Sequence, residues 1–301
     1  MRTAFINALV DHARSNERIF LVVGDLGFSV VEAFAREFPD RFLNAGVAEQ
    51  NMTGLAAGLA SEGYHVFTYS IANFPTLRCL EQIRNDICYH DLPVTVVSVG
   101  AGMAYGNLGY SHHAVQDIAA LRGLPNMTVL SPADPGETTS AIDWIASHPG
   151  PSYLRLGKAG EKLLTEREPI HKTPRKVLAQ DGAYAIVATG SILSEALDAA
   201  KSLINQGQLF DVFSCPWLAP VVAATFSELA GYKRVFVVEE HVRQGGLGEM
   251  IASYLSGCTV VENFSVPVET AGEVGSQDYL RARAGLDAKG LTTRITALII
   301  S

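Results

Sequence analysis

A single carboxylate stands within a small and apolar stretch of the chain, NAGVAEQNMTGLAAGLA at residues 44–60. That carboxylate belongs to Glu49. An acid near the start of a helix is stabilised by the helix dipole, which would explain Glu49 without any function. A buried, ionised carboxylate is costly, however, unless its surroundings supply a partner. We therefore expect Glu49 to face such a partner.

A second set of side chains suited to chemistry is the pair His112 and His113, in the glycine-rich segment YGNLGYSHH. A histidine in a loop is most often a solvated surface residue. Its imidazole can also exchange protons or hydrogen bonds with a substrate near neutral pH. Spacing alone leaves both interpretations open.

The bulk composition limits the classes of protein to consider. The 301 residues suffice for two domains with their own cores, and 48% hydrophobic with 18% charged residues is typical of a globular chain. A net charge of −8, with no basic run, argues against a nucleic-acid surface. A small anionic substrate remains compatible with this charge, because a few local cations suffice to bind it.

Targeting and redox signals favour a cytoplasmic protein. The N-terminal MRTAFINALVDHARSNE lacks the apolar stretch of a signal peptide, and no run of about 18 apolar residues predicts a membrane span. The cysteines show no CxxC pair and no histidine at metal-ligand spacing, so we expect neither a disulfide framework nor a zinc site. They are Cys79, Cys88, Cys215 and Cys258.

The elements that position these side chains follow an alternating pattern. Apolar strand-like runs alternate with helical spacing, which predicts parallel sheets covered on both faces, with ligands at the carboxyl ends of the strands. The composition becomes charged and proline-containing in the segment RLGKAGEKLLTEREPIHKTPRK. A second unit of alternating strand-like and helical patterns follows it. We expect an α/β fold of two doubly wound domains, 1–160 and 178–301, joined by a linker at 161–177.

Several motifs, in order, resemble one enzyme family. The segment RFLNAGVAEQNMTGLAAGLASEG resembles the acid-bearing helix of the thiamine-diphosphate enzymes of the transketolase group. The segments YSIANF, LEQIRNDI, GYSHHAVQDIAALRGLPNMTVLSPAD, GPSYLRLGK and VVEEHVRQGGLGE are similar to later parts of the same family. The resemblance implies a pyrimidine-binding domain followed by a smaller transketolase C-terminal domain.

The resemblance also implies roles at the cofactor. Glu49 matches the glutamate that hydrogen-bonds the pyrimidine of thiamine diphosphate and thereby activates the cofactor, which would supply the partner expected above. Phe74 matches the aromatic residue that stacks on the pyrimidine, and Asp25 matches a position near the cofactor.

Further roles are implied at the substrate. His112 matches the histidine that contacts substrate oxygens, and His113 stands beside it where relatives commonly carry Gln. Arg155, Ser29 and Arg2 match positions that hold a distal anion. Where transketolases of ordinary sugar phosphates carry Asp, four residues before the histidine, this chain has Leu108, so a different hydroxyl pattern or anion is expected.

The resemblance is to only half of a complete transketolase. The domain with the GDG segment and downstream Asn that hold magnesium and diphosphate has no counterpart, so no metal ligands are expected on this chain. We predict the C-terminal subunit of a split transketolase that transfers a two-carbon ketol unit from a ketose to an aldehyde. The partner would be the N-terminal, magnesium-binding subunit, in an α2β2 heterotetramer.

Three other functions fit the same fold. The beta subunit of a 2-oxo-acid dehydrogenase's decarboxylating component shares the architecture and an AEQ helix, whereas EQIRNDI and LPNMTVLSPAD favour transketolase. Deoxyxylulose-phosphate synthase is normally one fused chain. A non-catalytic structural or regulatory subunit is the alternative from another class, and Glu49 argues against it.

Overall fold

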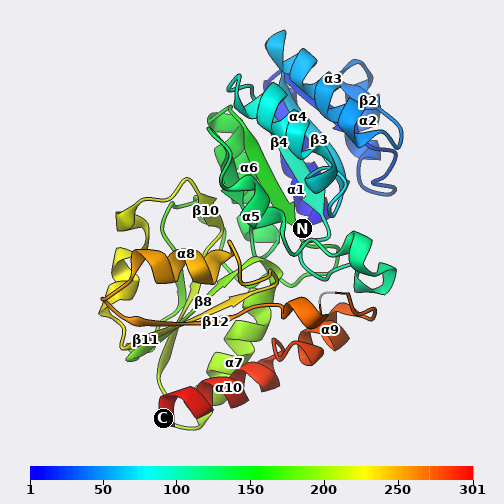
Figure 1. Cartoon of the computed structure of the whole chain (residues 1–301). Helices are drawn as coiled ribbons and strands as arrows, with labels where there is room; N and C mark the ends of the chain where they lie inside the picture. Colours follow the sequence, from blue (N-terminus) through cyan, green and yellow to red (C-terminus); the bar gives the residue numbers. More distant parts are fainter. Residues whose placement is uncertain (271, 301) are drawn as a thin grey trace.

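The apolar runs of the first half form a parallel sheet in the computed structural model of this chain, which describes residues 1–270 and 272–300 (Figure 1). Residue 301, the last of the predicted second domain, lies outside the described residues. The strand order is β10-β5-β6-β4-β3-β1-β2, and only the pair β10–β5 is antiparallel. Its strands are β1 (Ile19–Val23), β2 (Phe42–Asn44), β3 (His65–Ile71), β4 (Val94–Val99), β5 (Thr128–Leu130), β6 (Ser152–Leu156) and β10 (Trp217–Ala219).

The second half builds a smaller sheet of the same kind. Its order is β12-β11-β8-β9-β7, with only β7–β9 antiparallel. The strands are β7 (Arg175–Leu178), β8 (Tyr184–Thr189), β9 (Phe210–Ser214), β11 (Arg234–Glu239) and β12 (Val260–Phe264). Two α/β domains with mostly parallel sheets were predicted, and this fold class is confirmed.

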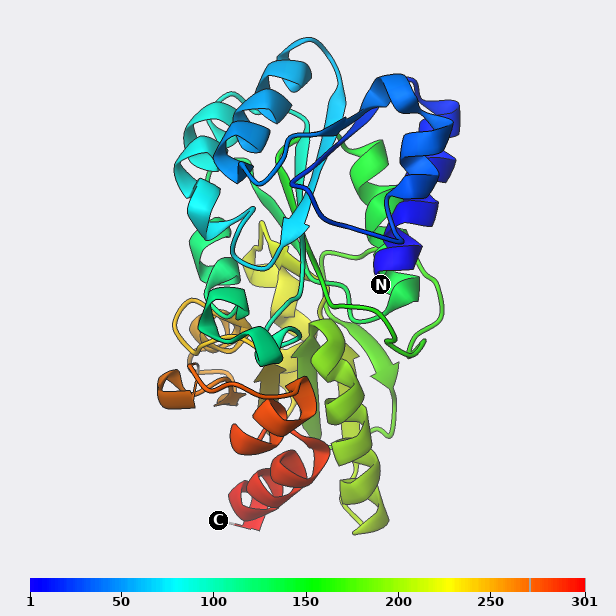
Figure 2. The ribbon, with the colours of Figure 1, turned by 90° about the vertical axis from the view of Figure 1, so that its right-hand side faces the viewer.

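Helices cover both faces of the first sheet. One face packs on α1 (Arg2–Ser15) and α6 (Pro135–Ser147), and the other on α3 (Glu49–Ser61) and the segment from α4 (Leu80–Gln82) into a π-helical turn. Figure 2 shows these two groups on opposite sides of the strands. The other helices are α2 (Glu32–Glu37), α5 (Asp117–Leu121), α7 (Leu193–Asn205), α8 (Leu247–Tyr254), α9 (Gln277–Arg283) and α10 (Ala288–Ile300).

The two domains share apolar contacts. One core cluster combines Met127 and Val129 of the first sheet with Phe213 and Val235 of the second. A further cluster lies under α7 and α10 on the far face of the second sheet. The second domain is therefore packed against the first rather than tethered beside it.

Two elements cross the predicted boundaries. Strand β7 lies partly inside the predicted linker because two of its four residues, Arg175 and Lys176, are charged and none is fully buried, so its apolar signal is too short to stand out. The run FDVFSCPWL divides at Cys215–Pro216 into β9 and β10, and β10 returns to the first sheet. Proline cannot donate to a strand ladder, which accounts for the break.

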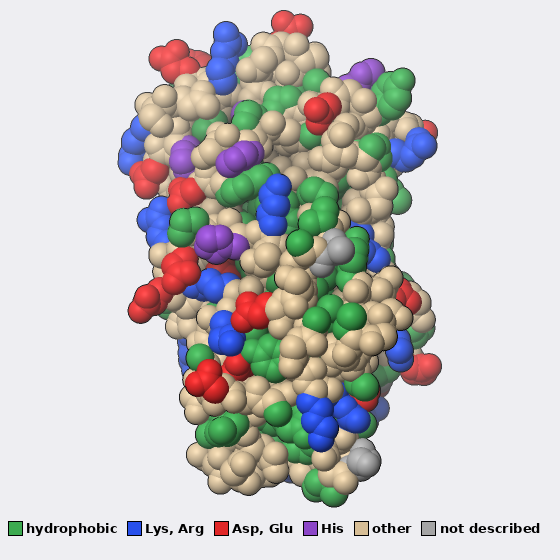
Figure 3. Space-filling model, turned by 90° about the vertical axis from the view of Figure 1, so that its left-hand side faces the viewer, with side chains coloured by type: hydrophobic (Ala, Val, Ile, Leu, Met, Phe, Trp, Pro, Cys, Tyr) green, Lys and Arg blue, Asp and Glu red, His purple; other side chains and the backbone are tan. Residues whose placement is uncertain are grey.

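The surface in Figure 3 carries interspersed acidic and basic side chains, with Lys and Arg scattered over the face shown. Among the described residues, no helix is both long and apolar enough to cross a membrane.

One buried histidine should make the first domain sensitive to acid. His65 stacks on Phe67 and is within hydrogen-bonding distance of the Thr95 hydroxyl, and burial lowers the pKa of His65 to about 4. Between about pH 6.5 and pH 4, His65 is therefore protonated in the unfolded chain but not in the folded chain. Stability should fall between about pH 6.5 and pH 4, by up to about 3 kcal/mol from this residue.

Urea denaturation at pH 7 and pH 4.5 measures this effect. The His65→Gln variant, which keeps a hydrogen-bonding group near Thr95, should lose less stability on acidification than the unsubstituted chain. Equal losses in both proteins would contradict the role of His65.

Candidate functional site

Glu49 is the first residue of α3, just after the chain leaves β2. The N-cap residue Ala48 provides no side-chain cap. The Glu49 carboxylate in the first turn therefore interacts favourably with the positive end of the helix dipole. The residue is only 2% exposed. It lies close to the end of β1, because a Cβ added at Gly24 would be 3.6 Å from Glu49 Cγ. The only carboxylate of the segment 44–60 is thus buried at the carboxyl ends of the strands.

The partner of Glu49 in this structure is Arg78. Arg78 Nη1 donates to Glu49 Oε2 at 2.7 Å, and Arg78 Cζ lies 4.4 Å from the centroid of the Phe74 ring. Arg78 is not among the predicted site residues. Its signal in the sequence is weak, because one arginine in a short turn (Leu77–Cys79) gives no indication that the turn folds back onto α3.

The turn after β3 positions Phe74. Ala72 adopts a left-handed conformation with φ 48°, and its carbonyl accepts a 2.7 Å hydrogen bond from the Ser98 hydroxyl. Such backbone geometry is uncommon outside glycine and is held here by its neighbours. Asn73 Nδ2 donates to the carbonyl of His113 at 2.8 Å, which fixes the turn to the histidine loop.

His112 lies directly beside Phe74. The two rings pack edge to face at 5.1 Å, and His112 Nδ1 lies 3.0 Å from the Ser111 hydroxyl. Partial burial and the neighbouring His113 both lower the pKa of His112, which favours the neutral form of its imidazole. Three predicted residues (Glu49, Phe74 and His112) therefore lie in one row, linked through Arg78.

Other predicted residues border this row or lie apart from it. Asp25, exposed at the end of β1, exchanges hydrogen bonds with Asn44 through Asn44 Nδ2 at 2.9 Å and Asp25 N at 3.1 Å. Ser29 is exposed in the same loop, and its amide donates to Glu32 Oε1. His113 is fully buried, with its ring 6.5 Å from that of Tyr110.

Arg155 requires a correction. It is 2% exposed, Nε donates to Asp117 Oδ2 at 2.7 Å, and Nη2 donates to the carbonyls of Ala114 and Glu240. A guanidinium so enclosed does not fit the predicted role of holding a substrate anion. The sequence could not reveal this, because the sequence pattern around an arginine at the end of a strand does not distinguish one that faces a substrate from one that pairs with a buried aspartate.

The Arg155 contacts instead support the histidine loop. Burial by itself would raise the pKa of Asp117, but the Arg155 charge and His241 outweigh burial and lower that pKa. This pair holds the carbonyl of Ala114, which forms an isolated bridge with Gly102 at the base of the loop.

The second domain supports the other end of the same loop. Glu240 accepts hydrogen bonds from Arg281 at 2.7 Å and from the amide of Met103 at 3.4 Å. Gly106 packs so closely on the α9 region that an added Cβ would lie 2.3 Å from a Leu280 methyl. Figure 1 shows this loop between the first domain and α9. His112 is therefore positioned by both domains.

Arg2 is half-buried on the far side of the loop. Its positive charge lies near Tyr69 and Tyr105 and acts to lower the pKa of both phenols, against the raising effect of burial. Among the described residues, Arg2 Nε is buried without a hydrogen-bond partner. Arg2 thus retains an unused donor beside the loop that carries His112.

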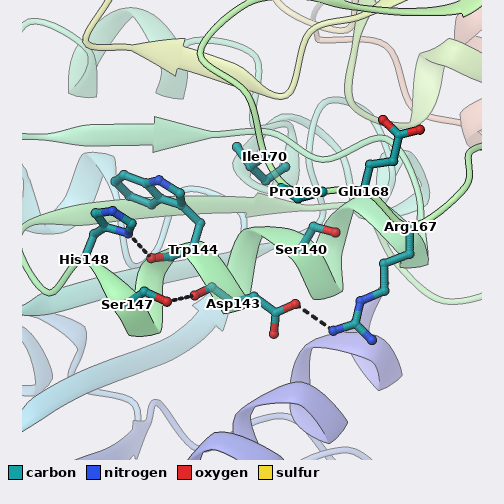
Figure 4. A pocket seen from close by; sticks show the side chains of 9 residues that line it. All are labelled: Ser140, Asp143, Trp144, Ser147, His148, Arg167, Glu168, Pro169 and Ile170. Atoms are coloured by element: carbon teal, nitrogen blue, oxygen red, sulfur yellow. Dashed lines mark hydrogen bonds and ion pairs between the residues drawn. The ribbon is translucent and has the colours of Figure 1, made fainter.

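Two other features of the surface lie away from this row. A pocket of about 360 Å³ is lined by α6 and the segment at 167–170, on the opposite face of the first sheet from α3, and contains no predicted site residue (Figure 4). The glycine-rich turn before α8 resembles a weak phosphate cradle, but the Glu239 carboxylate already accepts hydrogen bonds from the amides of Leu247 and Gly248. That turn is structural.

The residues of the row fit the pyrimidine of thiamine diphosphate. The Arg78 guanidinium is a flat group that donates to the Glu49 carboxylate and lies over the Phe74 ring. An aminopyrimidine is also flat, and can share a proton with a carboxyl group while it stacks on an aromatic ring. In the described part of the chain, no group of three or more His, Cys, Asp or Glu side chains is arranged to hold a metal.

Comparison with protein families covers nearly the whole chain. Residues 1–160 match the family described as "Transketolase, pyrimidine binding domain", and residues 176–291 match "Transketolase, C-terminal domain".

Individual relatives are similar over almost their full length. The chain is 33% identical to one of the subunits of the apulose-4-phosphate transketolase of Phocaeicola vulgatus, covering 96% of this chain and 94% of that protein. It is 32% identical to "6-deoxy-6-sulfo-D-fructose transketolase subunit SqwH" of Clostridium sp., covering 96% and 91%. The solved structure "Split gene transketolase, inactive beta4 tetramer" superposes with a TM-score of 0.85 at 32% identity, covering 98% and 96%.

Breaking the Arg155–Asp117 pair should destabilise the fold and loosen the histidine loop. In Arg155→Met, Asp117 is left as a buried charge without its cation, and we expect a loss of about 3–5 kcal/mol in the free energy of unfolding. Urea denaturation measures the loss, and hydrogen exchange of residues 103–113 measures the loop.

The exposed Arg36 provides the matched control. Arg36→Met should change neither quantity by much. If Arg155→Met were equally silent, the buried pair would have no part in holding the loop.

Proposed function

The chain belongs to the transketolase family, and from this premise we propose that it is the C-terminal subunit of a split, thiamine-diphosphate-dependent transketolase. The single observation that carries the site assignment is the row of Glu49, Phe74 and His112 at the carboxyl ends of the strands. Both relatives described above are named as transketolase subunits, which favours ketol transfer over acyl transfer to lipoamide.

The cofactor supplies the nucleophilic carbon and the electron sink that cleavage of a ketose carbon–carbon bond requires. Glu49 binds the pyrimidine through its carboxyl group and holds a proton at the ring nitrogen. Phe74 orients the ring by stacking. His112, whose lowered pKa favours the neutral imidazole, exchanges hydrogen bonds and protons with the substrate oxygens.

The domain division is part of the same proposal. Residues 1–160 provide the cofactor-facing half, and residues 178–301 provide a domain that supports the histidine loop through Glu240 and α9. The diphosphate and Mg²⁺ are held by a partner subunit, in an α2β2 heterotetramer. The structural relative described as an inactive tetramer of beta chains supports the view that such a chain alone lacks the reaction.

The substrate is a ketose that differs from the common sugar phosphates. Leu108, 56% exposed in the loop of His112, offers no hydrogen bond to a sugar hydroxyl where the family pattern has Asp. A distal anion remains part of the proposal, with Arg2 as the candidate cation and Ser29 as a further donor. Relatives of nearly equal identity are named for a phosphorylated and a sulfonated ketose, so the identity values do not choose between these anions.

The partner docks on the exposed side of α3. Gly54 and Gly58 are exposed, and an added Cβ at either would meet nothing within 4 Å, whereas Ala57 and Ala60 face the core. Leu55 is 39% exposed between the two glycines. This combination of small residues and an exposed leucine permits close approach of another backbone along the middle and second half of α3, the helix that begins at Glu49.

Removal of the Glu49 carboxylate tests the catalytic assignment. In the complex with the partner subunit, Glu49→Gln should lower ketol transfer at least a hundredfold, because positioned proton transfer typically contributes that much. A coupled assay of ketose consumption measures the rate. Glu17→Gln, in the exposed turn between α1 and β1, should retain full activity; a fully active Glu49→Gln enzyme would favour a structural subunit.

A bulky side chain on α3 tests the docking face. Gly58→Leu should keep the chain folded, since leucine favours a helix more than glycine does by about 0.8 kcal/mol. Its affinity for the partner subunit should fall at least tenfold, measured by analytical ultracentrifugation. Gly123→Leu, at another exposed and open glycine, is the control. Unchanged association of the Gly58 variant would place the interface elsewhere.

A further inference from the structure

The contacts of Arg78 reproduce those that the proposed function assigns to the cofactor pyrimidine. Arg78 donates a 2.7 Å hydrogen bond to Glu49 and stacks over Phe74 with Cζ 4.4 Å from the ring centroid. These are the same carboxylate and the same ring. A guanidinium and an aminopyrimidine cannot both occupy the space between them.

The main chain of Arg78 is fixed by hydrogen bonds, whereas its side chain is free to change conformation. Its carbonyl accepts a hydrogen bond from Gln50 Nε2 at 3.1 Å, and its amide donates to Asn73 O at 3.2 Å. The side chain, in contrast, is 46% exposed, although the carboxylate it reaches is only 2% exposed. The long side chain can therefore turn into solvent without disturbing the turn that carries Phe74.

The energetics favour such an exchange. A buried carboxylate without a partner is costly, so the chain alone benefits from a cation at Glu49. A half-exposed arginine loses little on leaving, because water solvates its charge once it moves out. Glu49 thus has a partner both before and after the cofactor arrives.

We propose that Arg78 is a built-in occupant of the pyrimidine site, which competes with the cofactor ring for Glu49 and Phe74 and swings into solvent when that ring binds. The inference rests on the proposed function, since it takes the ring to be the pyrimidine of thiamine diphosphate. The apparent affinity for the pyrimidine ring is the intrinsic affinity multiplied by the fraction of chains in which the Arg78 side chain already points into solvent.

The test measures binding of the pyrimidine alone to the full chain. The probe is 4-amino-5-hydroxymethyl-2-methylpyrimidine, which carries the cofactor ring without the diphosphate that the partner subunit would hold. Dissociation constants are measured by NMR titration, with the Arg78 Nε–Hε signal as a direct report of side-chain release. If about one chain in ten has Arg78 turned out, Arg78→Ala should bind the probe about tenfold more tightly.

Controls separate this inference from the function it rests on. Arg84→Ala removes an exposed arginine of the same segment and should bind as the unsubstituted chain does. Arg78→Lys keeps the charge but loses the planar stack, and should fall between the two. Thermal melts should show Arg78→Ala folded, with a lower Tm when ligand is absent.

Each outcome decides one point. Equal or weaker binding by Arg78→Ala, or no binding by either form, overturns the competition. If Arg78→Ala binds tightly and a second substitution, Glu49→Gln, leaves that binding unchanged, Glu49 is not the pyrimidine ligand, and it is the proposed function that fails.

Discussion

The structure depends on one electrostatic constraint, a carboxylate buried at the start of a helix that must always have a partner. The helix dipole stabilises the Glu49 carboxylate, but at 2% exposure this group is not solvated by water. In this chain the partner is Arg78, which also lies over Phe74. The need for a partner explains why the carboxylate, the aromatic ring and the cation come together from separate strand ends.

A second constraint acts on the loop that carries His112. Its base is held by Arg155 through Ala114 and by Glu240 through Met103, and its outer part rests on α9 through Gly106. Buried charges are expensive unless they are paired, and here the paired charges lie where the two domains meet. The C-terminal domain therefore contributes to the geometry of a site from which its own side chains are absent in the described contacts.

The sequence predicted the elements better than their connections. Apolar runs and helical spacing indicated mostly parallel sheets with covering helices in both domains, because burial on both faces leaves a strong pattern, whereas the short and largely exposed β2 gave no such pattern. Strand β7 extends into the predicted linker since it is short, with two of its four residues charged and none fully buried, and β10, within the predicted second domain, pairs in the first sheet because the short break at Cys215–Pro216 redirects the chain.

The site was predicted in part. Glu49 could be singled out because a lone acid in an apolar helix is anomalous, and the resemblance to transketolases named Phe74 and His112, which lie beside each other here. Arg155 was assigned to an anion that its burial does not fit, and Arg78 was not named at all. Both arginines depend on contacts between residues far apart in the sequence, 38 positions for Arg155 with Asp117 and 29 for Arg78 with Glu49, which local patterns do not encode.

The most direct measurement of the central claim is the rate at which the acidic thiazolium C–H proton of bound thiamine diphosphate exchanges with deuterium, in the complex of this chain with its partner subunit. If the Glu49 carboxyl group activates the cofactor, replacing it with alanine should slow this exchange by at least a hundredfold while cofactor remains bound. An exchange rate that is the same with and without the Glu49 carboxyl group would contradict the account.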